Sequence, residues 1–349
     1  MQKITSNWGA GKTEYFYKLS PDKILLSAES CGLKCTGRVL QLNSMENRVY
    51  EVEIEVDESE LQSKWDKSRI IKFYRPGRWS KEQILDEHQF LADLAAGDLP
   101  VAAAIPFEDG STLKTVDEVG IDYAVFPKIG GRNPDEMTRE KMTSLGRLIA
   151  RMHLIGGEKA ANHRLRLDID TFGTSNLKFL LDQKLIPLDF ESRYKTAFEK
   201  IMELTEPHLK MATPLRIHGD LHFGNVLEGS QGTFFVDFDD MLTGPAVQDL
   251  WLVAGASTQT ETPYEDLLAG YTELRHFPIA ELKLAESLRA MRFVHFAAWI
   301  GKRIEDPYFA KTFTEYGSWN YWQSETTDLE RQLATAQSAL TGSPVNQFH

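Results

Sequence analysis

The segment from Ile217 to Asp240 contains the residue types that phosphoryl transfer requires. Its first part reads IHGDLHFGN and ends at Asn225, and Asp237 follows twelve residues later within the run FFVDFDD. Such a reaction needs a carboxylate that orients and deprotonates the attacking hydroxyl, and oxygen ligands that hold Mg²⁺ against the β- and γ-phosphates. We therefore predict Asp220 as the catalytic base and Asn225 and Asp237 as Mg²⁺ ligands, with the Asp237 carboxylate also acting in catalysis.

The same residues have a purely local interpretation. Asp, Asn and Gly are common in turns and at helix caps, which would explain His-Gly-Asp and Asp-Phe-Asp without any chemistry. The order of the two motifs and the apolar hairpin expected over residues 215–237 favour the catalytic interpretation, because a hairpin brings residues before and after its turn side by side. We expect His218 to be a structural residue of this loop.

Lys72 stands in the middle of an apolar run, Ile70–Tyr74. A buried ammonium is costly unless it is paired or faces a ligand, and an exposed position on an edge strand is the simpler alternative. Glu87 favours pairing because it falls on the apolar stripe of the following helix, with Ile84 and Leu91, where a carboxylate needs a cation. We predict a Lys72–Glu87 ion pair whose lysine also contacts the nucleotide phosphates, as in protein-kinase-like folds.

Ser44 lies in a polar turn, residues 43–47, between two predicted strands. In a kinase-like arrangement this turn lies over the nucleotide, where the Ser44 hydroxyl and backbone N–H groups can meet phosphate oxygens. A plain polar turn without ligand contacts is the alternative. We count Ser44, together with Lys72 and Glu87, among the predicted cofactor-binding residues.

The elements that must position these residues change in character along the chain. The first third is predicted to contain helices over residues 21–33 and 81–95, the second opened by a capping box of Ser80 and Gln83, and strands over 37–42, 48–53, 69–74, 102–105 and 123–126. The remainder is predicted to be mainly helical, over 135–154, 191–209, 281–303 and 327–340. Strands and helices segregated in this way are typical of the α+β class. We predict a protein-kinase-like bilobal fold, with a small β-rich nucleotide-binding N-lobe (1–129) and a larger helical catalytic and substrate C-lobe (130–349).

Composition narrows the class of protein. The chain has 349 residues, 42% hydrophobic and 26% charged, which is long enough for two lobes. A net charge of −12 argues against nucleic acid or an anionic membrane as a partner. The two cysteines, Cys31 and Cys35, fit a reducing compartment better than a disulfide-rich fold. No leader-like segment or long apolar run is visible, so we expect a soluble, cytoplasmic protein, and we also expect a monomer.

Taken together, the motifs resemble the aminoglycoside phosphotransferase and choline kinase superfamily. The stretches that carry the resemblance keep the same order along the chain and are LNSMENRVY (42–50), KFYRP (72–76), EHQF (87–90), AVFP (124–127), HGD (218–220), GPAVQDLW (244–251) and LRAMR (288–292). The resemblance implies ATP and Mg²⁺ as cofactors, with Asp220 as catalytic aspartate, Asn225 and Asp237 as magnesium ligands, and Ser44 as a nucleotide contact. It also implies a cytoplasmic serine/threonine protein kinase that acts in the stress response.

Other functions would use the same residues. A small-molecule kinase would accept an amino alcohol or an aminoglycoside-like hydroxyl, with Asp239 and Asp240 in an acidic pocket for the cationic acceptor. A nucleotide-binding scaffold without transfer is a further alternative, although such a protein would be free to lose members of the set that is complete here. A metal-dependent hydrolase is disfavoured because the acidic cluster lacks the several His ligands that such sites often use.

Overall fold

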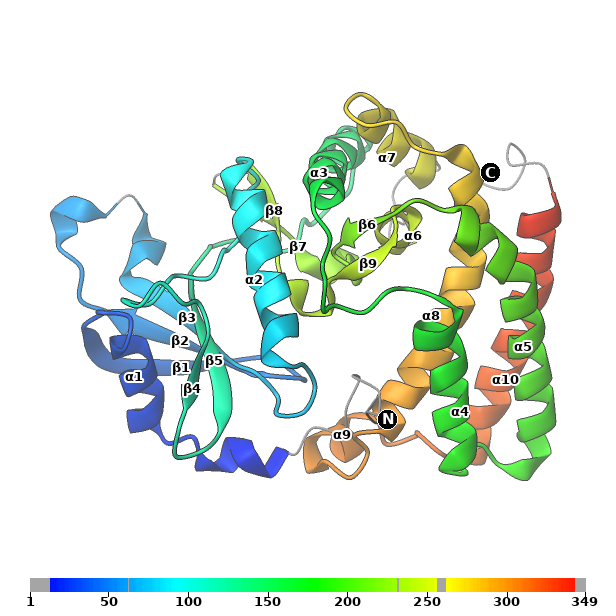
Figure 1. Cartoon of the computed structure of the whole chain (residues 1–349), viewed down its shortest axis with the longest axis horizontal. Helices are drawn as coiled ribbons and strands as arrows, with labels where there is room; N and C mark the ends of the chain where they lie inside the picture. Colours follow the sequence, from blue (N-terminus) through cyan, green and yellow to red (C-terminus); the bar gives the residue numbers. More distant parts are fainter. Residues whose placement is uncertain (1–12, 62, 231, 256–261, 343–349) are drawn as a thin grey trace. The chain divides into compact units, whose positions relative to one another are not determined.

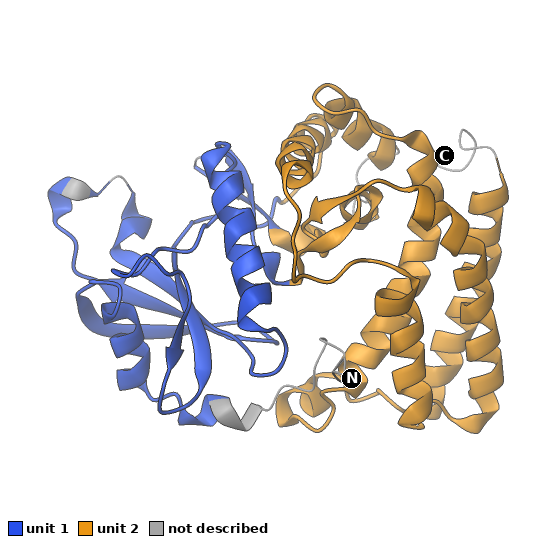
Figure 2. Ribbon diagram, in the orientation of Figure 1, with its two compact units in different colours: residues 1–134, 226–239 blue, residues 135–225, 240–349 orange. Residues whose placement is uncertain are grey.

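A computed structural model of the chain describes residues 13–61, 63–230, 232–255 and 262–342 (Figure 1). The contacts within the chain group it into two compact units: Met1–Pro134 with Val226–Asp239, and Asp135–Asn225 with Asp240–His349 (Figure 2). The predicted α+β class is confirmed, because the first unit is built on a sheet and the second is mainly helical. The predicted lobe boundary at residues 129 and 130 stays a prediction.

The first unit is a five-stranded antiparallel sheet in the order β1-β2-β3-β5-β4 with two helices, α1 and α2. Its elements are α1 (Pro21–Glu29), β1 (Cys35–Leu42), β2 (Arg48–Ile54), β3 (Ser68–Phe73), α2 (Lys81–Ala96), β4 (Lys114–Val116) and β5 (Ile121–Pro127). Side chains alternate across a strand, so Ile71 and Phe73 join the buried cluster against α1 while Lys72 faces the other side of the sheet. That side is covered by α2 (Figure 1).

Local signals predicted most of this unit correctly. The β1–β2 hairpin is present, and Ser80 and Gln83 form the predicted capping box at the start of α2. The predicted strand at 102–105 is wrong: Pro100 and Pro106 flank this segment and have no N–H to donate, and the fourth strand is β4 instead. The predicted helix at 21–33 is too long, since α1 ends at Glu29 and the chain turns back into β1.

The second unit consists of helices around a two-stranded ribbon. The helices are α3 (Arg139–Glu158), α4 (Ser175–Asp182), α5 (Leu188–Met211), α6 (Val247–Ala254), α7 (Pro263–Thr272), α8 (Ala285–Gly301), α9 (Pro307–Thr312) and α10 (Trp319–Thr341), and the ribbon pairs β6 (Pro214–Ile217) with β9 (Leu242–Pro245). Helix α3 packs against α7 and β6, α5 packs against α10, and α8 packs against α4 and α10. The predicted helices at 191–209, 281–303 and 327–340 correspond to α5, α8 and α10.

The predicted hairpin over residues 215–237 is wrong in its pairing. Residues 214–217 form β6 and pair with β9, whereas the hairpin consists of β7 (Val226–Gly229) and β8 (Gly232–Phe235) and groups with the first unit. Reciprocal backbone hydrogen bonds between Arg132 and Glu228, of 3.0 and 2.8 Å, attach it there. The two ribbons therefore belong to different units.

Helix α3 also differs from its prediction, since it continues through Gly156 instead of ending there. A β-carbon at Gly156 would lie 2.2 Å from the Arg216 carbonyl oxygen in β6. Glycine is therefore required at this position because the helix approaches the strand closely, and not because the helix ends.

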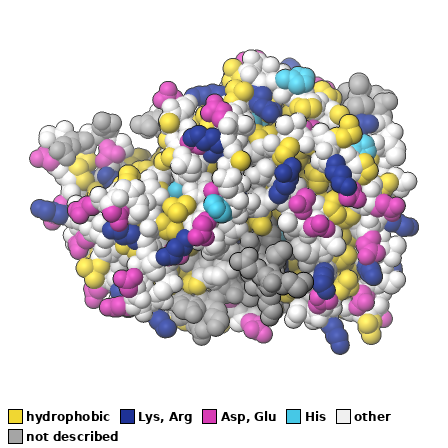
Figure 3. Space-filling model, in the orientation of Figure 1, with side chains coloured by type: hydrophobic (Ala, Val, Ile, Leu, Met, Phe, Trp, Pro, Cys, Tyr) yellow, Lys and Arg dark blue, Asp and Glu magenta, His cyan; other side chains and the backbone are white. Residues whose placement is uncertain are grey.

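The structure also bears on the expectations about membranes, surface charge and cysteines. None of the helices in the described ranges is long and apolar enough to cross a membrane. On the face drawn in Figure 3, basic and acidic side chains are interspersed. Cys31 and Cys35 are free and half-buried, and burial raises the pKa of each thiol to about 11, so neither is a reactive thiolate at neutral pH.

Candidate active site

The loop after β6 carries the predicted base and is fixed by Asp249. This carboxylate is fully buried in the first turn of α6 and accepts hydrogen bonds from the backbone N–H groups of His218 and Gly219, both at 2.9 Å. It also bonds Nε2 of His153 at 3.0 Å. The loop that ends at Asp220 is thus held by a side chain from a later helix, a role that the sequence pattern does not reveal.

Gly219 permits the tight path of this loop. Its φ is +84°, and a β-carbon would lie 2.3 Å from the Asp240 carbonyl oxygen. Its own carbonyl oxygen accepts a hydrogen bond of 3.0 Å from Nε2 of Gln248. A larger residue would displace the backbone next to the predicted base.

The side chain of Asp220 is partly exposed, and its two oxygens have different surroundings. Nη1 of Arg292 donates to Oδ1 at 2.6 Å, whereas Nε2 of His222 lies 3.6 Å from Oδ2. Burial lowers the pKa of His222, although the Asp220 carboxylate acts in the opposite direction. The imidazole is therefore neutral at pH 7, and the Asp220 charge is balanced mainly by Arg292.

Asn225 is tied to the same loop. Its Nδ2 donates to the Asp220 carbonyl oxygen at 2.9 Å, and the residue is 8% exposed. Since the amide nitrogen is engaged, the amide oxygen is the atom left for a ligand.

In the first unit, Lys72 and Glu87 form the predicted ion pair, with Nζ of Lys72 3.1 Å from Oε1 of Glu87. A second carboxylate, Asp239, lies closer, with Oδ1 2.7 Å from the same ammonium. Burial by itself lowers the pKa of Lys72, but Asp239 and Glu87 outweigh it and hold the pKa well above its ordinary value. The lysine is therefore a permanent buried cation.

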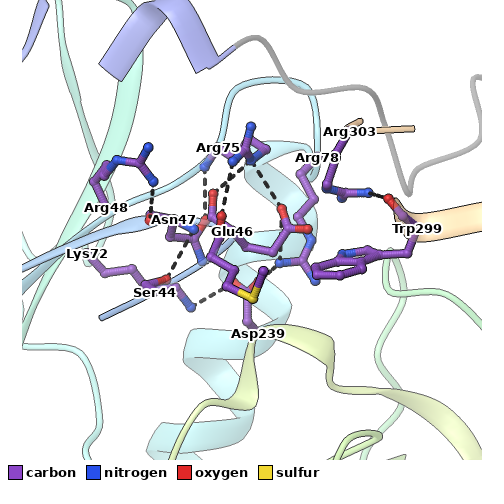
Figure 4. A network of polar contacts seen from close by, with 11 residues as sticks. Ser44, Glu46, Asn47, Arg48, Lys72, Arg75, Arg78, Asp239, Trp299 and Arg303 are labelled. Atoms are coloured by element: carbon purple, nitrogen blue, oxygen red, sulfur yellow. Dashed lines mark hydrogen bonds and ion pairs between the residues drawn. The ribbon is translucent and has the colours of Figure 1, made fainter. Parts of the chain in front are cut away.

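The alternative of a small-molecule kinase places Asp239 in an acidic acceptor pocket, whereas the structure shows its carboxylate paired with cations. It is 3% exposed and pairs with both Lys72 and Arg78. Arg78 in turn lies 3.7 Å from the Glu46 carboxylate. The three side chains link the lysine to the hairpin tip (Figure 4).

The tip between β1 and β2 is held in place by Arg75, which is 2% exposed. Arg75 donates through its backbone N–H to Oδ1 of Asn47 at 3.0 Å and through its guanidinium to the carbonyl oxygens of Glu46 and Met45 at 2.8 and 3.1 Å. Within the tip, Oγ of Ser44 accepts a 3.3 Å hydrogen bond from the Asn47 N–H. The signal for this support is the run RPGR, residues 75–78, which places two arginines directly after β3.

Asp237 follows β8 and has a φ of +62°. This left-handed conformation is uncommon for residues other than glycine, with Asp and Asn the main exceptions. Asp237 belongs to the first unit, while Asp220 and Asn225 belong to the second. The catalytic and ligand roles assigned to these residues stay predictions.

Comparison with known proteins places the chain. Residues 38–284 match the sequence profile of the phosphotransferase enzyme family. The chain is 36% identical over 325 residues to stress response kinase A of Escherichia coli strain K12. The alignment covers 92% of this chain and 95% of that protein. It is 35% identical over 320 residues to serine/threonine protein kinase RdoA of Salmonella typhimurium strain LT2, covering 91% and 93%.

A solved structure has a similar fold. The amicoumacin kinase hAmiN, in complex with AMP-PNP, Ca²⁺ and Ami, aligns with a TM-score of 0.72 at 19% identity, over 91% of this chain and 96% of that one. The resemblance seen in the sequence motifs is confirmed by the family profile and by the two relatives. Because the family profile matches residues 38–284 and the two relatives align over more than nine tenths of the chain, the chain belongs to the phosphotransferase enzyme family.

Proposed function

We propose that the protein is an ATP- and Mg²⁺-dependent kinase that transfers the γ-phosphate of ATP to a hydroxyl, with Asp220 as the base. The orientation of Asn225 carries the proposal. Its Nδ2 is bonded to the backbone of Asp220, so that an oxygen ligand for a hard cation is held in the same loop as the carboxylate. A turn that served folding alone would not require this combination.

The nucleotide is assigned to residues of the first unit. Lys72 is the permanent cation for the α- and β-phosphates, Glu87 positions it, and Ser44 offers a hydroxyl in a tip that Arg75 makes rigid. These contacts would orient the triphosphate, which is most of what catalysis of phosphoryl transfer requires.

The metal is assigned to the Asn225 amide oxygen and the Asp237 carboxylate. These two donors fit Mg²⁺, which takes one or two protein oxygens and completes its shell with phosphate oxygens and water. The described residues contain no group of three or more His, Cys, Asp or Glu side chains arranged to hold an ion. When bound, Mg²⁺ would neutralise charge on the β- and γ-phosphates.

We assign a serine or threonine hydroxyl of a protein as the acceptor, in a stress-response role. The support is the names of the two relatives, stress response kinase A and serine/threonine protein kinase RdoA, at 36% and 35% identity. A small hydroxyl-bearing molecule is the second candidate, favoured by the fold similarity to amicoumacin kinase. The engagement of Asp239 by Lys72 and Arg78 removes one argument for a cationic alcohol.

The test is incubation of the wild-type protein and Asp220→Ala with γ-labelled ATP and Mg²⁺, with either a generic protein acceptor or an amino alcohol. We expect the wild type to label protein and Asp220→Ala to be slower by about 10²- to 10⁴-fold, which is the usual contribution of a general base. The thermal shift produced by ATP checks that the variant still binds nucleotide. Equal labelling by both proteins would contradict the role of Asp220, and labelling of the amino alcohol alone would contradict the protein acceptor.

A further inference from the structure

Arg292 is a residue of α8 that the proposed function leaves without a role. It ends the motif LRAMR, and its Nη1 lies 2.6 Å from Oδ1 of Asp220, 72 residues away in the sequence. We propose that Arg292 is a positioning residue for the catalytic base, which holds Oδ1 and leaves Oδ2 for the acceptor hydroxyl. The inference rests on the proposed role of Asp220.

The helix that carries Arg292 is a rigid support. Its neighbours Leu288, Met291 and Val294 are at most 1% exposed, so one face of α8 is anchored in the core of the second unit. Arg292 lies at the edge of that face, with 33% of its side chain exposed. A guanidinium on a fixed helix imposes a direction on the carboxylate that it contacts.

The stability of the fold does not account for this pair. Both side chains retain contact with solvent, 33% for Arg292 and 25% for Asp220, and ion pairs in such surroundings contribute little to folding. The contact is nevertheless short, at 2.6 Å, and one of its two members is the predicted base. A contact of this kind restricts the rotation of the reactive carboxylate.

Without Arg292, the backbone of the loop would be fixed but the side chain of Asp220 would not. Asp249 holds the N–H groups of His218 and Gly219, which sets the path of the loop but leaves the Asp220 carboxylate free to rotate. The hydrogen bond from Arg292 removes that freedom. On the other side, His222 lies 3.6 Å from Oδ2, beyond hydrogen-bond distance, and leaves this oxygen available.

In the transfer step, the acceptor oxygen forms a bond to the γ-phosphorus as the bond from that phosphorus to the β–γ bridging oxygen breaks. The electron pair of the broken bond leaves with ADP, and the proton of the hydroxyl moves to Oδ2 of Asp220. In this proposal Arg292 stays on Oδ1 and acts only through the Asp220 carboxylate. Its contribution is therefore expected in kcat and not in the KM for ATP.

The experiment compares Arg292→Ala and Arg292→Lys with Arg289→Ala. Arg289 is a matched control because it lies on the same helix with 35% of its side chain exposed and pairs with Glu286 at 3.5 Å instead of with Asp220. We expect Arg292→Ala to lower kcat at least tenfold with the KM for ATP and the melting temperature unchanged. Arg292→Lys should keep part of the activity, added guanidinium should partly restore Arg292→Ala, and Arg289→Ala should keep wild-type kcat.

A double-mutant cycle with Asp220→Ala, measured under single turnover, tests the route of the effect. Because Arg292 is proposed to act through the carboxylate, adding Arg292→Ala to Asp220→Ala should lower the rate no further. The same fold loss in both backgrounds, or wild-type kcat in Arg292→Ala alone, would overturn the inference. Wild-type activity in Asp220→Ala would instead refute the proposed function, so the two failures are distinguishable.

Discussion

At the scale of single residues, the most consequential feature is the balance of charge around Lys72. Lys72 is 8% exposed, and its ammonium lies between the carboxylates of Glu87 and Asp239, residues that are 2% and 3% exposed. Buried charges are tolerated when they are paired, and removal of one partner leaves the others without compensation. Lys72 therefore supports the first unit as well as the predicted nucleotide site.

This balance gives a testable prediction for stability. Lys72→Met should destabilise the protein by about 3–5 kcal/mol, because Glu87 is left buried without its cation, while Glu87→Gln should destabilise it less because Asp239 still neutralises Lys72. The double variant should recover part of the loss of Lys72→Met. Urea unfolding of the four proteins measures the cycle, and strictly additive losses would show that the two side chains do not interact energetically.

At the scale of elements, the path from α3 through β6 sets the position of the catalytic loop. A β-carbon at Gly156 would meet the Arg216 carbonyl oxygen at 2.2 Å, whereas one at Gly157 has no neighbour within 4 Å. The two adjacent glycines of α3 thus have opposite requirements, and each serves as the control for the other.

Gly156→Ala should destabilise the protein by about 1–3 kcal/mol, as overpacking against a backbone atom does. It should also lower phosphotransfer, since β6 leads directly into His218. Gly157→Ala should stabilise the protein by about 0.5–1 kcal/mol, because alanine is favoured over glycine inside a helix. Thermal unfolding and the labelling assay provide the two readouts, and equal behaviour of the variants would contradict the packing argument.

Elements with local signals could be predicted from the sequence, and long-range pairings could not. The capping box at Ser80 and the apolar stripe that contains Glu87 lie within one helix, so periodicity reveals them. The pairing of β6 with β9, the contact of Lys72 with Asp239 and that of Asp220 with Arg292 join segments far apart in the chain. Periodicity carries no information on such contacts, which explains why the predicted hairpin over residues 215–237 has the wrong strand pairing.

At the scale of the whole molecule, a buried chain of polar groups connects a half-buried arginine with the catalytic loop. Arg275 donates to the Tyr271 hydroxyl at 2.7 Å, this hydroxyl lies 2.9 Å from Nδ1 of His153, and Nε2 of His153 lies 3.0 Å from Asp249. Burial lowers the pKa of His153 more strongly than the Asp249 carboxylate raises it. His153 is therefore neutral in the folded state.

This neutrality makes global stability depend on pH in a defined direction. In the unfolded chain a histidine takes up a proton as the pH falls through about 6.5, while the folded protein resists protonation of His153, so acid favours unfolding. His222, whose pKa burial also lowers, acts in the same direction. Glu325, whose pKa burial raises to about 7, acts in the opposite direction, because it binds a proton more readily in the folded state.

The contribution of His153 is therefore isolated by comparing the wild type with His153→Gln, which keeps a hydrogen-bonding side chain but does not titrate. The free energy of unfolding, measured by urea at pH 7.5 and at pH 5.5, should fall with acid more steeply in the wild type than in the variant. His222→Gln, measured in the same way, shows how much of the remaining pH dependence of the unfolding free energy comes from His222. Parallel slopes for the wild type and His153→Gln would mean that His153 takes up a proton as readily in the folded protein as in the unfolded chain, which would contradict a pKa lowered by burial.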